Sequence, residues 1–405
     1  MSTRRVRPPL AAARALALDR TATLSVFTMA VSGFAAVGFA ALTPLIRDDL
    51  ALSATAVGAI VSVFYLAGLL TVFPSGRLAD RLGAKTMIGA GQAFIAVGLV
   101  AMALAPSALA FFAGVAVLGC AYGAVTPAAT LLAAGTESPL RGWVMGVKQS
   151  GVTIGIAVAG AVLPALAIAS DWRSALALPA LACLIAALAL APAAGRERRG
   201  LPSAAPPAEP PPARPTAEVR FPRGLGAYGF LMSGFQFFVT IYLAVYLVDQ
   251  RELSAQTAGT AVAVAFTGGT AGRLAWGLMS DRLFASRIPA LQLTGAGAAA
   301  LAAALVLGGD AVLWPVLALL GFCCVGWNGV YQAAAVDQAD ASSYGRASGA
   351  ALSYLFLGAV ALPPVLGALL SLTSWSGAWL IAAICPAMAA VAAGVGVPRS
   401  RQDLK

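Results

Sequence analysis

Long apolar runs follow one another along almost the whole chain and are separated by short polar segments. A helix of about 20 apolar residues is long enough to cross a hydrocarbon core of roughly 30 Å. None of the runs alternates like a barrel strand, and a backbone in lipid must satisfy its own hydrogen bonds, so each run is predicted to be a helix. The twelve predicted spans cover about 22–46, 54–74, 85–105, 108–134, the stretch from Lys148 through Pro164, 174–194, 225–248, 255–277, 288–308, 311–336, 347–371 and 375–397.

The composition supports this prediction, because 60% of the residues are hydrophobic and only 10% are charged. Such a chain has too little polar surface for a soluble globule of its length. The Arg-rich start runs into a full-length span without a small-residue cleavage site, so we expect no cleavable signal. The predicted fold class is an all-α polytopic membrane protein.

The basic residues are distributed by side of the membrane. With a cytoplasmic N-terminus, 22 of the 26 Lys and Arg residues fall on the inside, Arg47, Arg173 and Arg251 fall outside, and Arg273 lies within a span. Cytoplasmic loops carry an excess of Lys and Arg. We therefore expect an inner-membrane protein with both termini cytoplasmic, and we read the net charge of +10 as topology and lipid contact rather than nucleic-acid binding.

A Pro-rich and Arg-rich segment without apolar periodicity divides the spans into two sets of six. The expected domains are a cytoplasmic arm (1–21), a six-helix bundle (22–194), a cytoplasmic linker (195–224), a second six-helix bundle (225–397) and a cytoplasmic tail (398–405).

One polar motif occurs in both halves. Gly76, Asp80 and Arg81 recur 201 residues later as Gly277, Asp281 and Arg282, each time after the second span of a half. This offset is close to half the chain, so the protein reads as two tandem copies of one unit, related by a pseudo-twofold axis. Function is expected where the copies meet.

This arrangement resembles the major facilitator superfamily (MFS) over the whole chain. The resemblance implies two bundles that move about a central site by alternating access. It also implies that the loop motif stabilises the state in which the cytoplasmic side is closed. The gating residues that it implies are Gly76, Asp80, Arg81, Gly83, Lys85, Gly277, Asp281 and Arg282. The chain departs from the family pattern at Ala84, which replaces the usual Arg, and at Phe284, which replaces a glycine.

The two motif aspartates can each rest against the positive N-terminal end of a helix from the other half. By resemblance, Asp80 is expected near Arg346 at the start of span 11, and Asp281 near Arg141 at the start of span 5. The competing interpretation is two surface aspartates that do not sense the conformational state.

The sequence does not support an enzyme, because it has no histidine, no Gly-Lys-[Ser/Thr] phosphate loop and no metal-ligand spacing, so neither cofactor nor metal is expected. All 16 acidic residues fall at or beyond the predicted span ends. A proton-driven carrier of cations would normally keep a carboxylate at mid-depth. A cation substrate is therefore disfavoured, and proton coupling is expected only indirectly, through the substrate or a displaced Lys148.

Arg273 is the charged residue that lies deep within a predicted span. It comes eight residues before Asp281 and is therefore roughly 12 Å along the helix from the cytoplasmic edge. An isolated Arg at that depth costs several kcal/mol unless it faces a wet cavity or an anion. The alternative to a substrate contact is that the side chain extends to the lipid headgroups. This alternative is stronger for Lys148, which is shallower, than for Arg273. We predict Arg273 and Lys148 as substrate-binding residues.

Further polar and aromatic residues are candidates for the same site. Trp327 with Tyr331, and Asn328 with Gln332, form i,i+4 pairs on span 10, and Gln236 lies on span 7. Each could instead join helices by hydrogen bonds.

The run from Arg273 to Gly277 resembles the eighth span of bacterial monocarboxylate and oxalate/formate-type porters, where an Arg holds the substrate carboxylate. The runs that begin at Lys148 and at Gly326 resemble those of organic-anion and cyanate-type porters. The chain lacks the span 11 Lys of the oxalate pattern and has Tyr354 as its most polar large residue there. This absence disfavours a dicarboxylate.

The function predicted from the sequence is secondary or facilitated transport of a small organic anion, a monocarboxylate, by a monomer. Efflux of an apolar or weakly acidic drug is the alternative within transport, and a non-transporting membrane sensor is a third possibility.

Overall fold

The computed structural model describes residues 19–52, 54–136, 140–200, 221–339 and 341–396, and all regular structure within these ranges is helical. The first half contains α2 (Arg20–Ser32), η1 (Gly33–Val37), η2 (Gly38–Leu42), α3 (Thr43–Asp49), α4 (Ala54–Leu82), α5 (Ala84–Ala103), α6 (Ala108–Ala134), α7 (Arg141–Ala169), α8 (Trp172–Ala175) and α9 (Ala177–Gly200). The second half contains α10 (Arg223–Asp249), α11 (Ala255–Arg282), α12 (Ile288–Leu307), η3 (Asp310–Val312), α13 (Leu313–Cys324), α14 (Asn328–Asp337), η4 (Ala341–Ser343), α15 (Tyr344–Leu372) and α16 (Trp375–Ala392).

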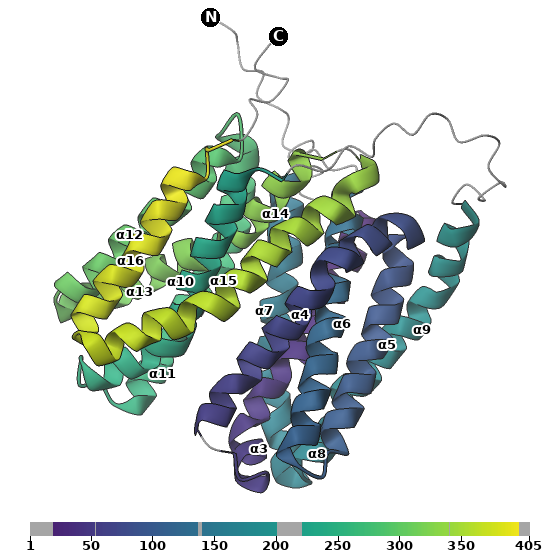
Figure 1. The fold of residues 1–405 in the computed structure, drawn as a ribbon, viewed down its shortest axis with the longest axis horizontal. Coiled ribbons are helices and arrows are strands. Elements are labelled where there is room, and N and C mark those ends of the chain that lie inside the picture. The colour runs from purple at the N-terminus through teal and green to yellow at the C-terminus, as the bar shows by residue number, and fades with distance from the viewer. Residues whose placement is uncertain (1–18, 53, 137–139, 201–220, 340, 397–405) are drawn as a thin grey trace, which may run out of the picture.

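The helices form two bundles that lie side by side, with α2–α9 in purple to teal and α10–α16 in green to yellow (Figure 1). The bundles approach each other at the upper end of this view, where α15 begins above the first bundle, and their lower ends lie apart. Most of the predicted linker, with the arm up to residue 18 and the tail, lies outside the described residues. The helix α9 continues to Gly200, inside the segment predicted as linker.

Among the described residues, eleven helical segments are long and apolar enough to cross a membrane. The twelfth predicted span is α11, whose 28 residues include Arg273, several threonines and several glycines. Its low hydropathy reflects the polar face that it presents to the centre of the molecule. The prediction of a polytopic all-α fold with twelve transmembrane helices is confirmed.

Three of the predicted spans are interrupted. The first changes from α-helix to a π turn at Gly33 and to a 3₁₀ turn at Gly38, and at both glycines the backbone packs tightly against α7. The sixth span breaks between α8 and α9 at Leu176. The tenth is two helices, because α13 ends at Cys324 and α14 begins at Asn328. The predicted stripe on span 10 therefore starts at a turn.

The most extensive contacts between the bundles are made by α4 with α15 and by α7 with α11, and α14 also packs on α7 and α15 on α6. The first two pairs correspond to each other in the internal repeat, since α4 and α11 carry the two copies of the motif. The repeat therefore explains why the molecule has two similar contacts between its halves.

Glycine makes both contacts possible. A Cβ on Gly76 would collide with the carbonyl of Gly345 in α15, and a Cβ on Gly277 would collide with the carbonyl of Gly142 in α7. Helices whose facing residues are small can bring their backbones close together. The motif glycines are thus positions of backbone contact between bundles.

We predict that Gly277→Ala forces α7 and α11 apart, because the new methyl group has no space and overpacking costs typically 1–3 kcal/mol. The expected result is a lower melting temperature and faster thiol labelling of a cysteine placed at Ser280, which is buried beside this contact. Gly160→Ala is the matched control, since a Cβ there would meet nothing within 4 Å. Equal behaviour of the two variants would contradict the close contact.

Candidate substrate site and gate

The first motif aspartate caps a helix of the opposite bundle. Asp80 Oδ1 accepts a hydrogen bond from the backbone N–H of Gly345 at 2.7 Å, and Oδ2 accepts one from Arg346 at 2.9 Å. The Arg346 guanidinium lies farther away, with Nε 3.9 Å from Oδ2. The carboxylate therefore interacts mainly with the unpaired N–H groups and the positive end of α15.

The second aspartate makes the equivalent contact. Asp281 accepts hydrogen bonds from the backbone N–H of Gly142 at 3.0 Å and of Trp143 at 2.7 Å, at the start of α7. Its side chain is 1% exposed. The structure thus shows both expected aspartate contacts formed at the same end of the molecule.

A network of ion pairs surrounds the second contact, whereas the first has the single long pair of Asp80 with Arg346. Arg287 pairs with Asp281 and also with Asp337, where Nε lies 3.1 Å from Oδ2. Asp337 in turn pairs with Arg141 at 3.3 Å, and Arg141 donates to the hydroxyl of Tyr344 at 2.9 Å. Since Tyr344 is the first residue of α15, this network links the two aspartate contacts. We name Asp80, Asp281, Arg141, Arg287, Asp337 and Tyr344 the gate network.

Sequence reasoning missed Arg287 and Asp337 as parts of this network. Neither belongs to the repeated motif, and Asp337 approaches Arg141 only because α14 ends beside the start of α7. Their charges were visible in the sequence, but their proximity depends on the packing of three helices.

The other motif residues have different surroundings. Gly83 has a φ of 88°, a left-handed conformation that favours glycine, and it turns the chain from α4 into α5. Arg81 and Arg282 are exposed and make no polar contact with the part of the chain that the structure describes. Lys85 is half-buried. A direct bond across the gate is therefore seen for the aspartates but not for the two motif arginines.

A cavity of about 420 Å³ lies between the bundles, within the roughly 300–1,000 Å³ range of small-molecule sites. Its polar lining residues are Tyr65, Tyr122, Thr126, Gln149, Thr153, Ser233, Gln236, Thr240, Thr267, Thr270, Arg273 and Asn328. Its apolar lining residues are Val37, Val152, Ile156, Ala157, Phe237, Phe266, Trp327, Leu352, Leu355 and Phe356. Of the predicted binding residues, Arg273, Gln236, Trp327 and Asn328 line the cavity, and Lys148, Tyr331 and Gln332 do not.

Arg273 is the one charged residue among those lining the cavity. It is 7% exposed, and its Nη1 donates to the carbonyl oxygen of Gln149 in α7 at 2.7 Å. Within the described ranges no carboxylate lies within ion-pair distance of it. The Arg273 Nε also donates to the carbonyl oxygen of Val325 at 3.5 Å. A guanidinium has five N–H donors, so these two bonds leave three of them for a ligand.

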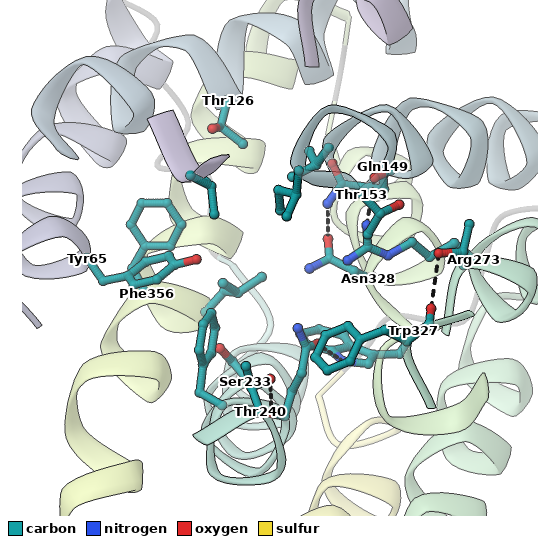
Figure 2. A pocket seen from close by; sticks show the side chains of 18 of the residues that line it. Tyr65, Thr126, Gln149, Thr153, Ser233, Thr240, Arg273, Trp327, Asn328 and Phe356 are labelled. Atoms are coloured by element: carbon teal, nitrogen blue, oxygen red, sulfur yellow. Dashed lines mark hydrogen bonds between the residues drawn. The ribbon is translucent and has the colours of Figure 1, made fainter. Parts of the chain in front are cut away.

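A chain of side-chain amides runs from Gln149, beside Arg273, to the buried Lys148. Gln149 Nε2 and Gln332 Nε2 each donate to Asn328 Oδ1 at 2.6 Å. Gln332 Oε1 then accepts from Lys148, whose Nζ also lies 2.8 Å from Thr130 Oγ1. Figure 2 shows Asn328 beside Arg273, with its nitrogen directed into the cavity.

Lys148 is completely buried at the far end of this amide chain. Thr130 and Lys148 belong to the first bundle and Gln332 to the second, so these hydrogen bonds cross between bundles. The structure thus places Lys148 in the interface between bundles, linked to the cavity residue Asn328 through Gln332.

The aromatic candidates also divide into two groups. Trp327 donates from Nε1 to Gln236 Oε1 at 3.0 Å, so these two cavity residues fix each other. Tyr331 is fully buried and donates to the carbonyl of Ala351 at 3.0 Å, which joins α14 to α15. Tyr331 therefore has the helix-joining role that was its alternative interpretation.

Gln149 was not singled out from the sequence as a binding residue, although it contributes to the cavity in two ways. Its carbonyl accepts from Arg273, and its side-chain Oε1 is buried without a hydrogen-bond partner. An unpaired buried acceptor beside a cavity is a group that a ligand can satisfy. The signal available in the sequence was its position next to Lys148 in an otherwise apolar helix.

Two helical bundles around a polar central cavity, joined at one end by helix-capping aspartates, have the organisation of a membrane transporter. A profile of the Major Facilitator Superfamily matches residues 24–363. The chain belongs to this family, whose members are transporters and not enzymes.

Curated relatives support the family and extend the comparison to named substrates. An uncharacterized MFS-type transporter of Mycobacterium tuberculosis is 26% identical over 86% of this chain and 78% of its own length. The hexuronate transporter of Bacillus subtilis is 27% identical over 60% of this chain and 59% of its own length. A probable L-galactonate transporter of Escherichia coli is 31% identical over 38% of this chain and 35% of its own. The comparisons confirm the superfamily but not the narrower resemblance to oxalate/formate-type or cyanate-type porters.

Solved structures share the fold. FucP in the outward conformation matches with a TM-score of 0.72 and 17% identity, over 93% of this chain and 99% of that chain. The human organic anion transporter MFSD10 matches with a TM-score of 0.72 and 15% identity, over 92% of this chain and 99% of that chain.

The gate network generates an asymmetric prediction. Asp80→Asn and Asp281→Asn each remove a charge from a helix end, an interaction worth roughly 0.3–2 kcal/mol. Asp281→Asn also removes the partner of Arg287, so we expect it to open the gate end more than Asp80→Asn does. The measurement is the labelling rate of a cysteine at Ser280 in each background. Asp48→Asn is the control, because Asp48 is exposed at the opposite end of the molecule. Equal labelling in all three variants would remove both aspartates from the gate.

Proposed function

We propose that this protein is a secondary transporter that carries a small organic anion with one carboxylate by alternating access. The observation that carries the proposal is Arg273, a buried cation that lines the cavity and has no acidic partner in the described parts of the chain. A charge buried without a counter-ion is costly. An anionic substrate would supply the missing partner.

Two amides can complete an anion site around Arg273. Asn328 uses its Oδ1 to accept from Gln149 and Gln332, and Gln236 uses its Oε1 to accept from Trp327. Both side chains line the cavity, so their NH₂ groups are available to a ligand. We assign Arg273 the two parallel hydrogen bonds to the carboxylate that a guanidinium can make, and Asn328 and Gln236 the supporting donors.

The single cation favours one carboxylate rather than two. Lys148 is sealed behind Gln332, so the cavity offers no second positive charge to a dianion. The named relatives agree with this, because L-galactonate and a hexuronate each carry one carboxylate. The cavity also has no Asp or Glu in its lining, so a coupled proton would travel on the substrate or through Lys148.

Arg273 can couple binding to the gate. Its bond to the Gln149 carbonyl crosses from α11 to α7, the same two helices that Asp281 joins at the gate. A carboxylate that attracts the guanidinium weakens this crossing bond. Substrate binding would then lower the free-energy cost of separating α7 from α11, which opens the gate end of the molecule.

The alternative function is efflux of an apolar or weakly acidic drug. Its support is the large apolar part of the cavity lining, which includes Phe237, Phe266 and Phe356. An apolar drug would not need a guanidinium, so the two functions differ in their dependence on Arg273.

For orientation, we propose that the gate end is cytoplasmic, as the distribution of Lys and Arg indicates. In a background without the five native cysteines, an impermeant thiol reagent added to intact cells should label Ser170→Cys and leave Ser286→Cys unlabelled. Both positions are exposed, at opposite ends of the molecule. The reverse labelling pattern would invert the orientation.

For the substrate site, we predict that Arg273→Ala abolishes carboxylate binding and transport. Arg273→Lys should keep the charge but weaken binding about tenfold or more, because lysine cannot form the two-pronged contact. Binding is measured by calorimetry on purified protein against a panel of mono- and dicarboxylates.

Arg47→Lys is the control for this experiment, since Arg47 is exposed at the far end of the first bundle and should bind as the wild type does. Wild-type transport of a carboxylate by Arg273→Ala would refute the organic-anion function and favour drug efflux.

A further inference from the structure

Aromatic rings form one wall of the cavity, opposite the polar wall. Tyr65 of α4 is in ring contact with Phe237 of α10 and with Phe356 of α15, at centroid distances of 4.8 Å and 5.3 Å. Tyr122 of α6 stacks on Phe356 at 6.5 Å. Both bundles therefore contribute to this aromatic wall.

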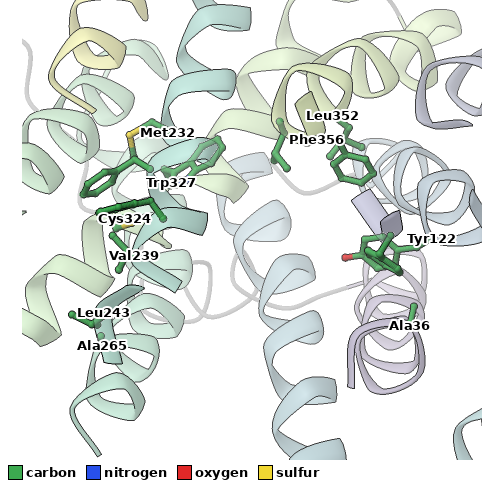
Figure 3. Packing of buried hydrophobic residues seen from close by; sticks show 14 of the residues in the cluster. Ala36, Tyr122, Met232, Val239, Leu243, Ala265, Cys324, Trp327, Leu352 and Phe356 are labelled. Atoms are coloured by element: carbon green, nitrogen blue, oxygen red, sulfur yellow. The ribbon is translucent and has the colours of Figure 1, made fainter. Parts of the chain in front are cut away.

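The figures show the two walls facing each other. In Figure 2, Tyr65 and Phe356 lie on one side of the cavity, and Arg273, Asn328 and Gln149 lie on the other. In Figure 3, Phe356, Leu352 and Tyr122 lie together on one side, and Trp327 lies on the opposite side. A ligand that fills the cavity meets a cation with amides at one edge and aromatic rings at the other.

Most threonines in the cavity do not direct a hydrogen-bond donor at a ligand. Their hydroxyls donate to carbonyls one turn back in their own helices, as seen for Thr126 to Tyr122 (2.8 Å), Thr153 to Ser150 (2.9 Å), Thr240 to Gln236 (2.8 Å) and Thr270 to Phe266 (3.1 Å). The lining is thus less able to hydrogen-bond a ligand than its count of hydroxyl residues suggests.

We propose that the substrate is an aromatic monocarboxylate, with its carboxylate at Arg273 and its ring against Tyr65, Tyr122, Phe237 and Phe356. This inference rests on the proposed anion function and narrows it. A polyhydroxy acid of similar length would bring hydroxyls against the aromatic wall, where each unpaired one weakens binding by about tenfold. A flat ring instead gains the favourable geometry of aromatic contacts.

The aromatic wall also offers two single polar contacts. The hydroxyls of Tyr65 and Tyr122 have no hydrogen-bond partner in the described structure, and Figure 2 shows the Tyr65 hydroxyl directed into the cavity. One ring substituent at the end opposite the carboxylate can therefore be hydrogen-bonded. The chemistry that fits is a benzoate-type anion, plain or with one hydroxyl opposite the carboxylate.

The test is calorimetric binding of four probes to the purified full chain at pH 7: benzoate, 4-hydroxybenzoate, gluconate and benzyl alcohol. We expect both benzoates to bind at least tenfold more tightly than gluconate, and benzyl alcohol not to bind. Arg273→Ala should lose all carboxylate binding. Gluconate binding as tightly as benzoate, with dependence on Arg273, would overturn the aromatic inference and leave the anion function intact.

Other outcomes would contradict the anion function itself, and not only the aromatic substrate. If none of the carboxylates binds, or if benzyl alcohol binds as well as benzoate, the anion function fails and the aromatic inference fails with it. The wild-type panel alone gives this answer, so the test does not depend on a variant that folds.

Two variants then locate the contact. Phe356→Leu keeps an apolar side chain but removes the ring, and should weaken benzoate about tenfold while changing gluconate less than twofold. Tyr65→Phe should weaken 4-hydroxybenzoate more than benzoate, because only 4-hydroxybenzoate can hydrogen-bond the Tyr65 hydroxyl. Phe94→Leu is the matched control, because Phe94 is 60% exposed on the outer face of α5. An unchanged benzoate affinity in Phe356→Leu would place the ring elsewhere and overturn the assigned contact.

Discussion

The contact between α7 and α11 is the interaction on which the site and the gate both depend. Arg273, Gly277 and Asp281 are spaced by four residues and therefore lie along one face of α11. Along that face, Arg273 bonds to the Gln149 carbonyl, Gly277 packs on Gly142, and Asp281 accepts hydrogen bonds from the first N–H groups of α7. A helix is stiff along its axis, so any separation of α7 from α11 acts on the cavity and the gate together.

The two buried cations reduce the stability of the contact between α7 and α11. Arg273 and Lys148 are both buried and bond only to neutral oxygens within the described structure. Such bonds satisfy donors but do not neutralise charge, and a buried unneutralised charge costs several kcal/mol. The closed arrangement therefore contains a cost that an anion can relieve at Arg273. Lys148 is sealed from the cavity, so relief there requires the bundles to separate or the amide chain to rearrange.

The fold and part of the site could be predicted from the sequence, because they depend on local patterns. Apolar runs of membrane-spanning length predicted the helices, and the repeat of Gly76 with Asp80 at Gly277 with Asp281 located the two equivalent contacts. The helix ends that the aspartates would meet were implied by the resemblance to the major facilitator superfamily. Arg273 was recognisable because charge within an apolar run is rare. The breaks in spans 1, 6 and 10 were not predicted. In spans 1 and 10 they fall at glycines whose backbone packs tightly on a neighbouring helix, which the sequence alone does not show.

The residues that were missed depend on three-dimensional neighbours. Asp337 meets Arg287 because α14 ends beside the start of α12, and it meets Arg141 because α14 also ends beside the start of α7. Lys148 was predicted at the substrate site because it is a basic residue just inside a span and its run resembles those of organic-anion porters, but its burial behind Gln332 depends on the rotation of α7. Sequence periodicity gives the side chains that share a face, and it does not give which face meets the cavity.

The repeat is informative where its two copies differ. The position that corresponds to Arg273 in the first copy is Val72, which is fully buried in α4, whereas Gly76 and Asp80 keep their counterparts. Both copies thus preserve the backbone contact and the helix cap that close the molecule, and only the second carries the cation. A second arginine at position 72 would add a like charge to the interface between bundles, with no acidic residue in the cavity lining to balance it. The symmetric part of the fold is therefore the contact that joins the bundles, and the departure from symmetry at Arg273 gives the cavity the cation on which the proposed anion site depends.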